Sequence, residues 1–277
     1  MPSSLPDFTD PPVVEVALSV QYEPLTALCT PAMGLLWSEF RDRFPNVEEH
    51  APLEAVIERF GVKGPKKVGV RVEMMPKPPV PRCWFLNEAG TELIQVQQDR
   101  FVHNWRKVGE GGDYPRYEHV RDRFKGELAV FESFVRREKL GELVPTQCEI
   151  TYVNHIVAGR GWETHGQVGE VLRLFVPKYS EAFLPEPEDA RMGVRYVIRG
   201  ADGDPLGRLH VTMEPVYRRE DDRPMLLLNL TARGRTEREG LDGVLGFLDV
   251  GREWVVRGFA AVTTAQMHKI WGRHDDH

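Results

Sequence analysis

Residues 12–22 read PVVEVALSVQY, and this stretch decides the fold of the first half of the chain. From Val14 to Tyr22, apolar side chains fall on every second position, and Glu15 and Gln21 are among the residues between them. Alternation with a period of two is typical of a β-strand that buries one of its faces. We therefore predict a strand here, with its apolar face toward a hydrophobic core.

Three helical patterns follow in the first half of the chain. Residues 33–44 carry apolar side chains three and four positions apart, and Pro45 ends this pattern. A shorter pattern covers residues 53–60 and stops at Gly61. The longest covers residues 117–140 and has one apolar face with charged residues opposite, which predicts a helix that packs on a sheet.

The other segments of the first half predict strands. Residues 68–74 and 82–86 have an extended pattern, and Asn87-Glu88-Ala89-Gly90 suits the turn of a hairpin. A long returning strand is expected from residue 92 to residue 107.

The second half of the chain runs through the same order of elements. We predict an extended run, a mixed connector, three strands and a long amphipathic helix. In that order they cover residues 148–157, 168–179, 194–199, 208–217, 225–231 and 241–262.

Both halves therefore predict the same α+β unit: a strand, a mostly helical connector, three antiparallel strands and a long helix. We infer an internal duplication, with units at residues 1–142 and 143–277 packed as one compact body. Each sheet is expected to pack on its long helix, because the apolar side of that helix needs a partner. The order is similar to helix-grip arrangements, and its doubled form resembles the saddle of TATA-box-binding proteins, a likeness of topology that carries no function. The alternative is one continuous α+β domain without a repeat.

Composition and charge bound the function. The 277 residues include 36 basic and 42 acidic side chains, and the formal charge of −6 counts against nucleic acid as a partner. Three widely spaced cysteines suggest neither a disulfide framework nor a metal clamp, and they fit a reducing cytoplasm. Residues 1–12 lack a secretion signal, and no apolar stretch reaches the roughly 20 residues that cross a bilayer. We expect a soluble, cytoplasmic, globular protein without a membrane segment.

Three stretches resemble a known protein family. They are PPVVEVALSVQYEPL at residues 11–25, LIQVQQDRFVHNWRK with the later YPRY between residues 93 and 117, and AVTTAQMHKIWGR at residues 261–273. In them the chain is similar to a sporadically distributed, uncharacterised family of bacterial proteins of about this length. Because no activity or ligand is established for that family, the resemblance implies no site residue. The patchy distribution is similar to that of accessory genes in mobile or defence-related loci, which implies at most a conflict-related role.

The most polar strand-like stretch is residues 95–106, QVQQDRFVHNWR. Taken as one strand, its two faces carry Gln95, Gln97, Asp99 and His103 on one side, and Gln98, Arg100, Asn104 and Arg106 on the other. Asp99 and His103 are then roughly 13 Å apart, too far for a catalytic dyad. The stretch is either a solvated sheet face, or a surface on which amides and arginines bind a partner beside Trp105 as an aromatic anchor.

Two further groups are candidates for a site. Tyr114, Arg116 and Tyr117 follow a glycine-containing loop that would close over the sheet face, or else the tyrosines pack the start of the helix onto the core. Asn154 is either a structural hydrogen-bond hub or a site residue. The candidate binding residues are therefore Gln97, Arg100, His103, Asn104, Trp105, Arg106, Tyr114, Arg116, Tyr117 and Asn154.

The sequence has no nucleophile elbow, no zinc motif and no phosphate-binding glycine loop. We therefore predict no catalytic residue, no metal site and no cofactor. The leading hypothesis is a noncatalytic binding or scaffold protein that holds a protein partner on an open sheet face or edge, where self-association would also be natural. The second is a small-ligand-binding protein or enzyme with a cavity between the sheet and a long helix. The third is nucleic-acid binding.

Overall fold

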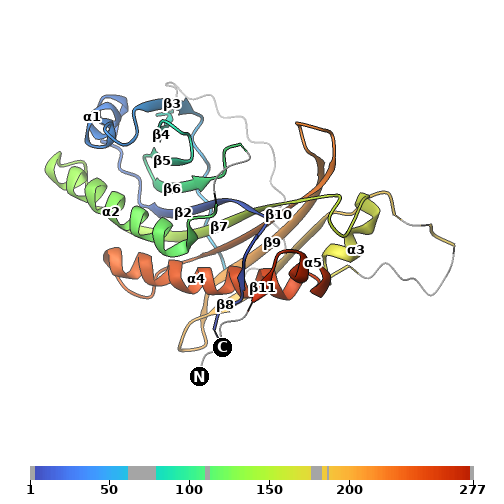
Figure 1. The fold of residues 1–277 in the computed structure, drawn as a ribbon. Coiled ribbons are helices and arrows are strands. Elements are labelled where there is room, and N and C mark those ends of the chain that lie inside the picture. The colour runs from blue at the N-terminus through green and yellow to red at the C-terminus, as the bar shows by residue number, and fades with distance from the viewer. Residues whose placement is uncertain (1–3, 62–78, 110–112, 176–182, 186, 275–277) are drawn as a thin grey trace.

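The computed structural model describes residues 4–61, 79–109, 113–175, 183–185 and 187–274. Its main feature is one antiparallel sheet of nine strands, in the order β3-β4-β5-β6-β2-β7-β10-β9-β8 (Figure 1). These strands are β2 (Val13–Tyr22), β3 (Asn46–His50), β4 (Arg82–Leu86), β5 (Glu92–Gln97), β6 (Arg100–Arg106), β7 (Pro145–Val157), β8 (Met192–Arg199), β9 (Pro205–Tyr217) and β10 (Pro224–Gly234). A separate pair joins β1 (Asp7–Phe8) to β11 (Arg273–His274).

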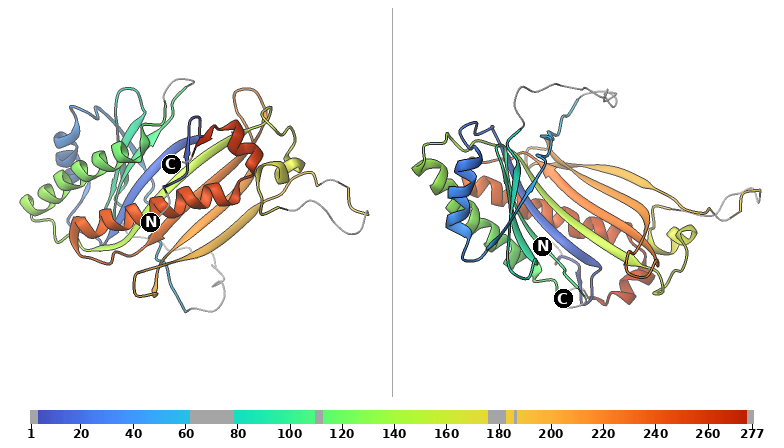
Figure 2. Two further views of the ribbon diagram at one scale, coloured as in Figure 1. Left: turned by 60° about the horizontal axis from the view of Figure 1, so that its bottom comes forward. Right: turned by 90° about the horizontal axis from the view of Figure 1, so that it is seen from above.

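Helices cover one face of the main sheet (Figures 1 and 2). They are α1 (Thr30–Phe40), α2 (Arg116–Arg137), the 3-10 turn η1 (His165–Gln167), α3 (Val168–Val171), α4 (Gly240–Val262) and α5 (Ala265–Ile270). The two long helices lie beside each other, α2 on β6 and β2, and α4 on β7, β10 and β9. We call the opposite face of the sheet the open face. Among the described residues, no helix is long and apolar enough to span a membrane.

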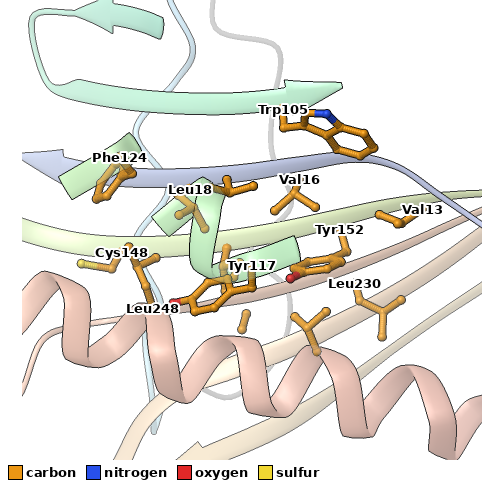
Figure 3. Close-up of a cluster of buried hydrophobic side chains, with 14 of the residues drawn as sticks. Val13, Val16, Leu18, Trp105, Tyr117, Phe124, Cys148, Tyr152, Leu230 and Leu248 are labelled. Atoms are coloured by element: carbon orange, nitrogen blue, oxygen red, sulfur yellow. The ribbon is translucent and has the colours of Figure 1, made fainter. Parts of the chain in front are cut away.

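The hydrophobic core lies between the sheet and the two long helices. Val16, Leu18 and Val20 of β2 are fully buried, and Figure 3 shows Leu18 in the same layer as Phe124 of α2. Burying each such side chain contributes about 1.5–3 kcal/mol. The alternation in residues 12–22 therefore predicted the strand and its buried face correctly.

One detail of that strand differs from the prediction. The pairing of β2 with β7 shifts register between Val13 and Glu15, so Val14 is an extra residue in a bulge. Val13 is buried in place of Val14, which is only half-buried. The apolar face of β2 thus continues through the bulge with the other valine.

Two predicted elements are wrong. Residues 51–60 form neither a helix nor a strand, and their apolar side chains do not face a core. The predicted long strand over residues 92–107 is two strands, β5 and β6, joined by a tight turn in which Gln97 pairs with Arg100. The predicted strand over residues 68–74 lies outside the described residues.

The strand order is the same outward from the centre in both directions. β2 is followed by β6, β5 and β4, while β7 is followed by β10, β9 and β8. β2 and β7 pair with each other, so one continuous sheet runs through both predicted units. The α+β class is as predicted, whereas the duplication of the two halves stays a prediction.

Candidate functional site

An extended segment lies across the open face of the sheet. It comprises residues 51–61, which we call the strap, and it leaves the edge strand β3 on the side away from α2 and α4 (Figure 2). The strap contacts side chains of β5, β2, β7 and β9, so it spans most of the width of the sheet. The peptide groups of the strap need hydrogen-bond partners, because the strap is not part of any strand pairing.

Three buried glutamines supply those partners. Gln97 of β5 accepts from the Leu53 N–H (2.9 Å) and donates to the Leu53 carbonyl (3.0 Å). Gln21 of β2 does the same for Val56, at 3.0 and 2.9 Å, and Gln147 of β7 accepts from the Glu58 N–H at 3.2 Å. A primary amide carries one acceptor and two donors, so it can pair with a peptide group as a neighbouring strand does. The sheet thus recognises the backbone of the strap.

The carboxylate of Glu58 is held by three basic groups at the far end of the strap. It is bonded to Arg208 and to His210, whose Nε2 lies 2.5 Å from Oε1. Arg233 approaches the same oxygen at 3.7 Å. The guanidinium of Arg208 also stacks on the ring of Phe60, 4.2 Å from its centre. Glu58 is therefore the only charged side chain of the strap with an ion pair among the described contacts.

We expect protonation of the Glu58 carboxylate at low pH to weaken this anchor. Burial acts to raise the pKa of the Glu58 carboxyl, but hydrogen bonds from His210 and Arg208 outweigh it and hold that pKa below its ordinary value of 4.5. A lowered folded-state pKa gives stability that is present above the ordinary value and is lost as the pH falls through the folded-state value.

We therefore expect hydrogen-exchange protection at the amides of Val56 and Glu58 to fall as the solution is acidified below pH 4.5. Mass spectrometry of peptides from the strap measures it, with amides of β2 as the internal reference. The variant Glu58→Gln should start with lower protection and show no such step. A wild-type strap that keeps its protection at low pH would show that the carboxylate does not hold it.

Hydrophobic burial does little to hold the strap. Leu53, Val56 and Ile57 remain 40%, 40% and 53% exposed. Since burial of apolar surface is the main stabilising term in folding, a segment that leaves such side chains in water is held mainly by its polar contacts. The strap is thus a weakly stabilised layer over a well-packed sheet.

A polar network continues on the open face beside the strap. Arg82 donates to Gln95 (2.9 Å), Gln95 to Asn104 (2.7 Å), and Asn104 to Glu15 (2.5 Å). Burial raises the pKa of the Glu15 carboxyl despite the contact from Asn104. Arg100 donates to Gln21 (2.8 Å) and to the carbonyl of Glu54 (2.9 Å).

Several donors in this network are unused. Among the described residues, the Nε of Arg82, the Nε of Arg100 and the Nε1 of Trp84 are buried without a hydrogen-bond partner. Burial lowers the pKa of Arg82, and its neighbour Arg100 lowers it further. Buried donors without partners are rare in folded proteins. The open face therefore favours a ligand that brings acceptors or negative charge.

The turn between β5 and β6 places some of the predicted site residues on the open face and others on the helix side of the sheet. Gln97, Arg100 and Asn104 take part in the contacts of the open face, and Arg106 holds the β4–β5 hairpin turn through the Gly90 carbonyl (2.7 Å). The predicted grouping of His103 with Gln95 and Gln97 is wrong, because the turn at residues 98–99 changes the alternation. The grouping of Gln95 and Gln97 apart from Arg100 and Asn104 is wrong for the same reason.

His103 and Trp105 point toward the helices. His103 is fully buried, and its Nδ1 lies 2.7 Å from the carboxylate of Glu127 in α2. Trp105 is buried against Tyr114, with ring centres 5.4 Å apart. Neither side chain is on the open face, so Trp105 is not the aromatic anchor of that surface.

The remaining predicted residues line a cavity of about 460 Å³ on the helix side of the sheet. These residues are Tyr114, Arg116, Tyr117 and Asn154. Tyr114, Arg116 and Tyr117 therefore lie on the helix side of the sheet and not on the open face. Asn154 donates to the Leu228 carbonyl (3.1 Å), which fits the predicted hydrogen-bond role.

Sequence reasoning missed the strap and its anchors. Gln21 and Gln147 lie on the polar sides of β2 and β7 and are directly paired across the two strands. Their polarity was visible, but a polar sheet face gives no sign of what crosses it. Among the described residues, no group of three or more His, Cys, Asp or Glu side chains could hold a metal ion.

Comparison of the chain with models of protein families, with curated proteins and with solved structures gives no match. The family resemblance of the three stretches is therefore not supported by these comparisons.

Proposed function

We propose that the protein binds an extended segment of a protein partner on the open face of its sheet, and that the strap occupies this face when the partner is absent. The observation that carries the proposal is the set of paired amide contacts from Gln97 and Gln21 to the strap backbone. Because these amides bond to peptide groups and not to side chains, they would bind any extended segment whose peptide groups have the same spacing.

Charge narrows the class of partner. Arg208, Arg233 and His210 converge on one carboxylate, that of Glu58, and the neighbouring Arg82 and Arg100 have unused donors. Charge-assisted hydrogen bonds would stabilise a carboxylate of the partner in the position of the Glu58 carboxylate. The favoured partner is an extended segment with an acidic side chain two residues after the peptide group bound by Gln21.

The strap is suited to leave the face. Its apolar side chains are largely exposed, so little apolar burial is lost when it leaves. The polar contacts that it loses would be replaced by those of the incoming segment. Since it is tethered, the strap competes at an effective concentration of about 1 mM. A partner segment must therefore bind the bare face more tightly than the strap does, and binding to the intact protein will be weaker than to the bare face.

The experiment removes the internal competitor. Residues 53–58 are replaced by glycine and serine at the same length, and a fluorescent peptide APLEAVIERFG, residues 51–61, is added. We expect fluorescence anisotropy to show binding to this variant and about 100-fold weaker binding to the wild type, because of the tethered competitor. A peptide with Glu58→Gln should bind the variant about tenfold more weakly, since a charge-assisted contact is lost.

Glu54→Gln in the same peptide is the matched control, because Glu54 contacts Arg100 through its backbone carbonyl. It should bind like the parent peptide. Absence of peptide binding to the strap-replaced variant would contradict the proposal. Binding of an oligonucleotide at low salt, without binding of the peptide, would reassign the open face to nucleic acid.

A further inference from the structure

The cavity on the helix side is a second site, separate from the open face. It lies where the N-terminal segment, α2 and α4 meet β7 and β10, and Figure 3 shows Tyr117 and Tyr152 between the sheet and α4. Its volume of about 460 Å³ falls in the range of small-molecule sites. Its apolar walls are Phe8, Val13, Leu230, Val255, Val256 and Phe259.

The polar lining of the cavity includes donor groups of Tyr114, Tyr152 and Arg252, together with the carboxylates of Asp7 and Glu118. The hydroxyls of Tyr114 and Tyr152 lie 2.7 Å apart. One hydroxyl donates to the other, so the second keeps a hydrogen that this contact does not use. The Nε of Arg252 is buried and has no hydrogen-bond partner among the described residues. Burial raises the pKa of Tyr152 to about 12, so its hydroxyl keeps its proton at neutral pH.

The charged groups around the cavity are paired at its rim. Arg252 is bonded to Glu118 (3.1 Å), whose side chain is 67% exposed, and Arg116 is bonded to Asp7 (2.5 Å). An ion pair with one such exposed partner contributes little, so an incoming anion can replace Glu118 at Arg252. Arg116 itself has a φ of 69°, a strained conformation for a residue with a side chain, and strain of this kind is often found at binding sites.

We propose that this cavity binds a small carboxylic acid with an apolar body. The carboxylate would accept hydrogen bonds from Arg252 and from the Tyr114–Tyr152 pair, and the apolar body would lie against Phe8, Val13 and Phe259. The site needs no movement of the strap and is independent of the proposed partner binding. A carboxylate is preferred to the corresponding alcohol because hydrogen bonds to a charged acceptor are the stronger ones.

Two acids and their matched alcohols test the inference by isothermal titration calorimetry. The probes are octanoate with 1-octanol, and 3-phenylpropionate with 3-phenylpropan-1-ol, each added to the full chain. We expect at least one acid to bind about tenfold or more tightly than its alcohol, because hydrogen bonds to a charged group are the strong ones. Absence of binding by both acids, or equal affinity of acid and alcohol, would overturn the proposal.

Variants locate the binding. Arg252→Gln and Tyr152→Phe should each weaken the bound acid, the first by about tenfold, while affinity for the alcohol changes little. Arg257→Gln is the matched control, because Arg257 lies on the same helix and pairs with Glu253 (2.8 Å) outside this cavity. Circular dichroism confirms that each variant is folded. Unchanged acid binding in folded Arg252→Gln would place the acid elsewhere and refute the assignment.

Discussion

Replacing Glu127 with alanine is expected to destabilise the protein by about 1–3 kcal/mol, the typical cost of leaving a buried hydrogen-bonding group without its partner. The Glu127 carboxylate is 2% exposed and lies between two basic groups, His103 Nδ1 at 2.7 Å and Arg43 Nη2 at 3.1 Å. His103 is completely buried, so loss of Glu127 leaves its Nδ1 without that partner and away from water. The other ring nitrogen of His103 has no hydrogen-bond partner among the described residues. Urea unfolding, followed by circular dichroism, measures the change.

Two further variants identify the cause of that loss. Glu132→Ala lies on the same helix, in an exposed pair with Arg136, and should cost no more than about 0.5 kcal/mol. The double variant His103→Leu with Glu127→Leu removes both buried polar groups and should recover most of the loss, because an apolar pair of similar volume is often as stable. A double variant as unstable as Glu127→Ala would assign the effect to packing of α2 and not to the unpaired histidine.

The same pair shows what the sequence could and could not predict. The apolar side of α2 follows from its spacing, and the helix was predicted close to its observed bounds. The partner of His103 could not be predicted, because Glu127 lies 24 residues away and faces it only once α2 packs on β6. Local periodicity determines which face is buried, but long-range packing determines which polar groups meet there.

The strap is a case in which local periodicity predicted the wrong structure. Leu53, Val56 and Ile57 have helical spacing, and that spacing predicted a helix. The structure has an extended segment because the sheet offers amide partners to the peptide groups of Leu53 and Val56, and Pro52 lies at its start. A short isolated helix is marginally stable, so tertiary hydrogen bonds outweigh local preference. The polar residues of the candidate site were therefore visible in the sequence, while their common partner was not.

Placement of the polar residues on two faces separates two proposed sites whose residues the sequence did not distinguish. Gln97, Arg100 and Asn104 take part in contacts on the open face, whereas Tyr114 and Asn154 line the cavity between the sheet and α4. One sheet with a polar open face and an apolar core face can carry both sites without overlap. A variant that impairs one site should therefore leave the other intact, and each proposal can fail alone.

Replacing both Gln21 and Gln97 with alanine is expected to release the strap while the sheet and helices stay folded. The two side chains make four hydrogen bonds to the backbone of Leu53 and Val56. At about 0.5–1.5 kcal/mol for each net hydrogen bond, the strap loses about 2–6 kcal/mol of local stability. We expect hydrogen exchange at Leu53 and Val56 to rise about 30-fold or more, because local opening governs exchange in a weakly held segment.

The chain offers a matched control for this change one residue further on. Gln98 lies in the turn after β5, and its side chain donates to the Thr26 carbonyl at 3.3 Å, away from the strap. Gln98→Ala should leave exchange at Leu53 and Val56 unchanged, and amides of β2 and β7 should stay protected in every variant. If the double variant exchanges like the wild type at the strap, the glutamines do not hold it, and the open face loses the observation on which partner binding rests.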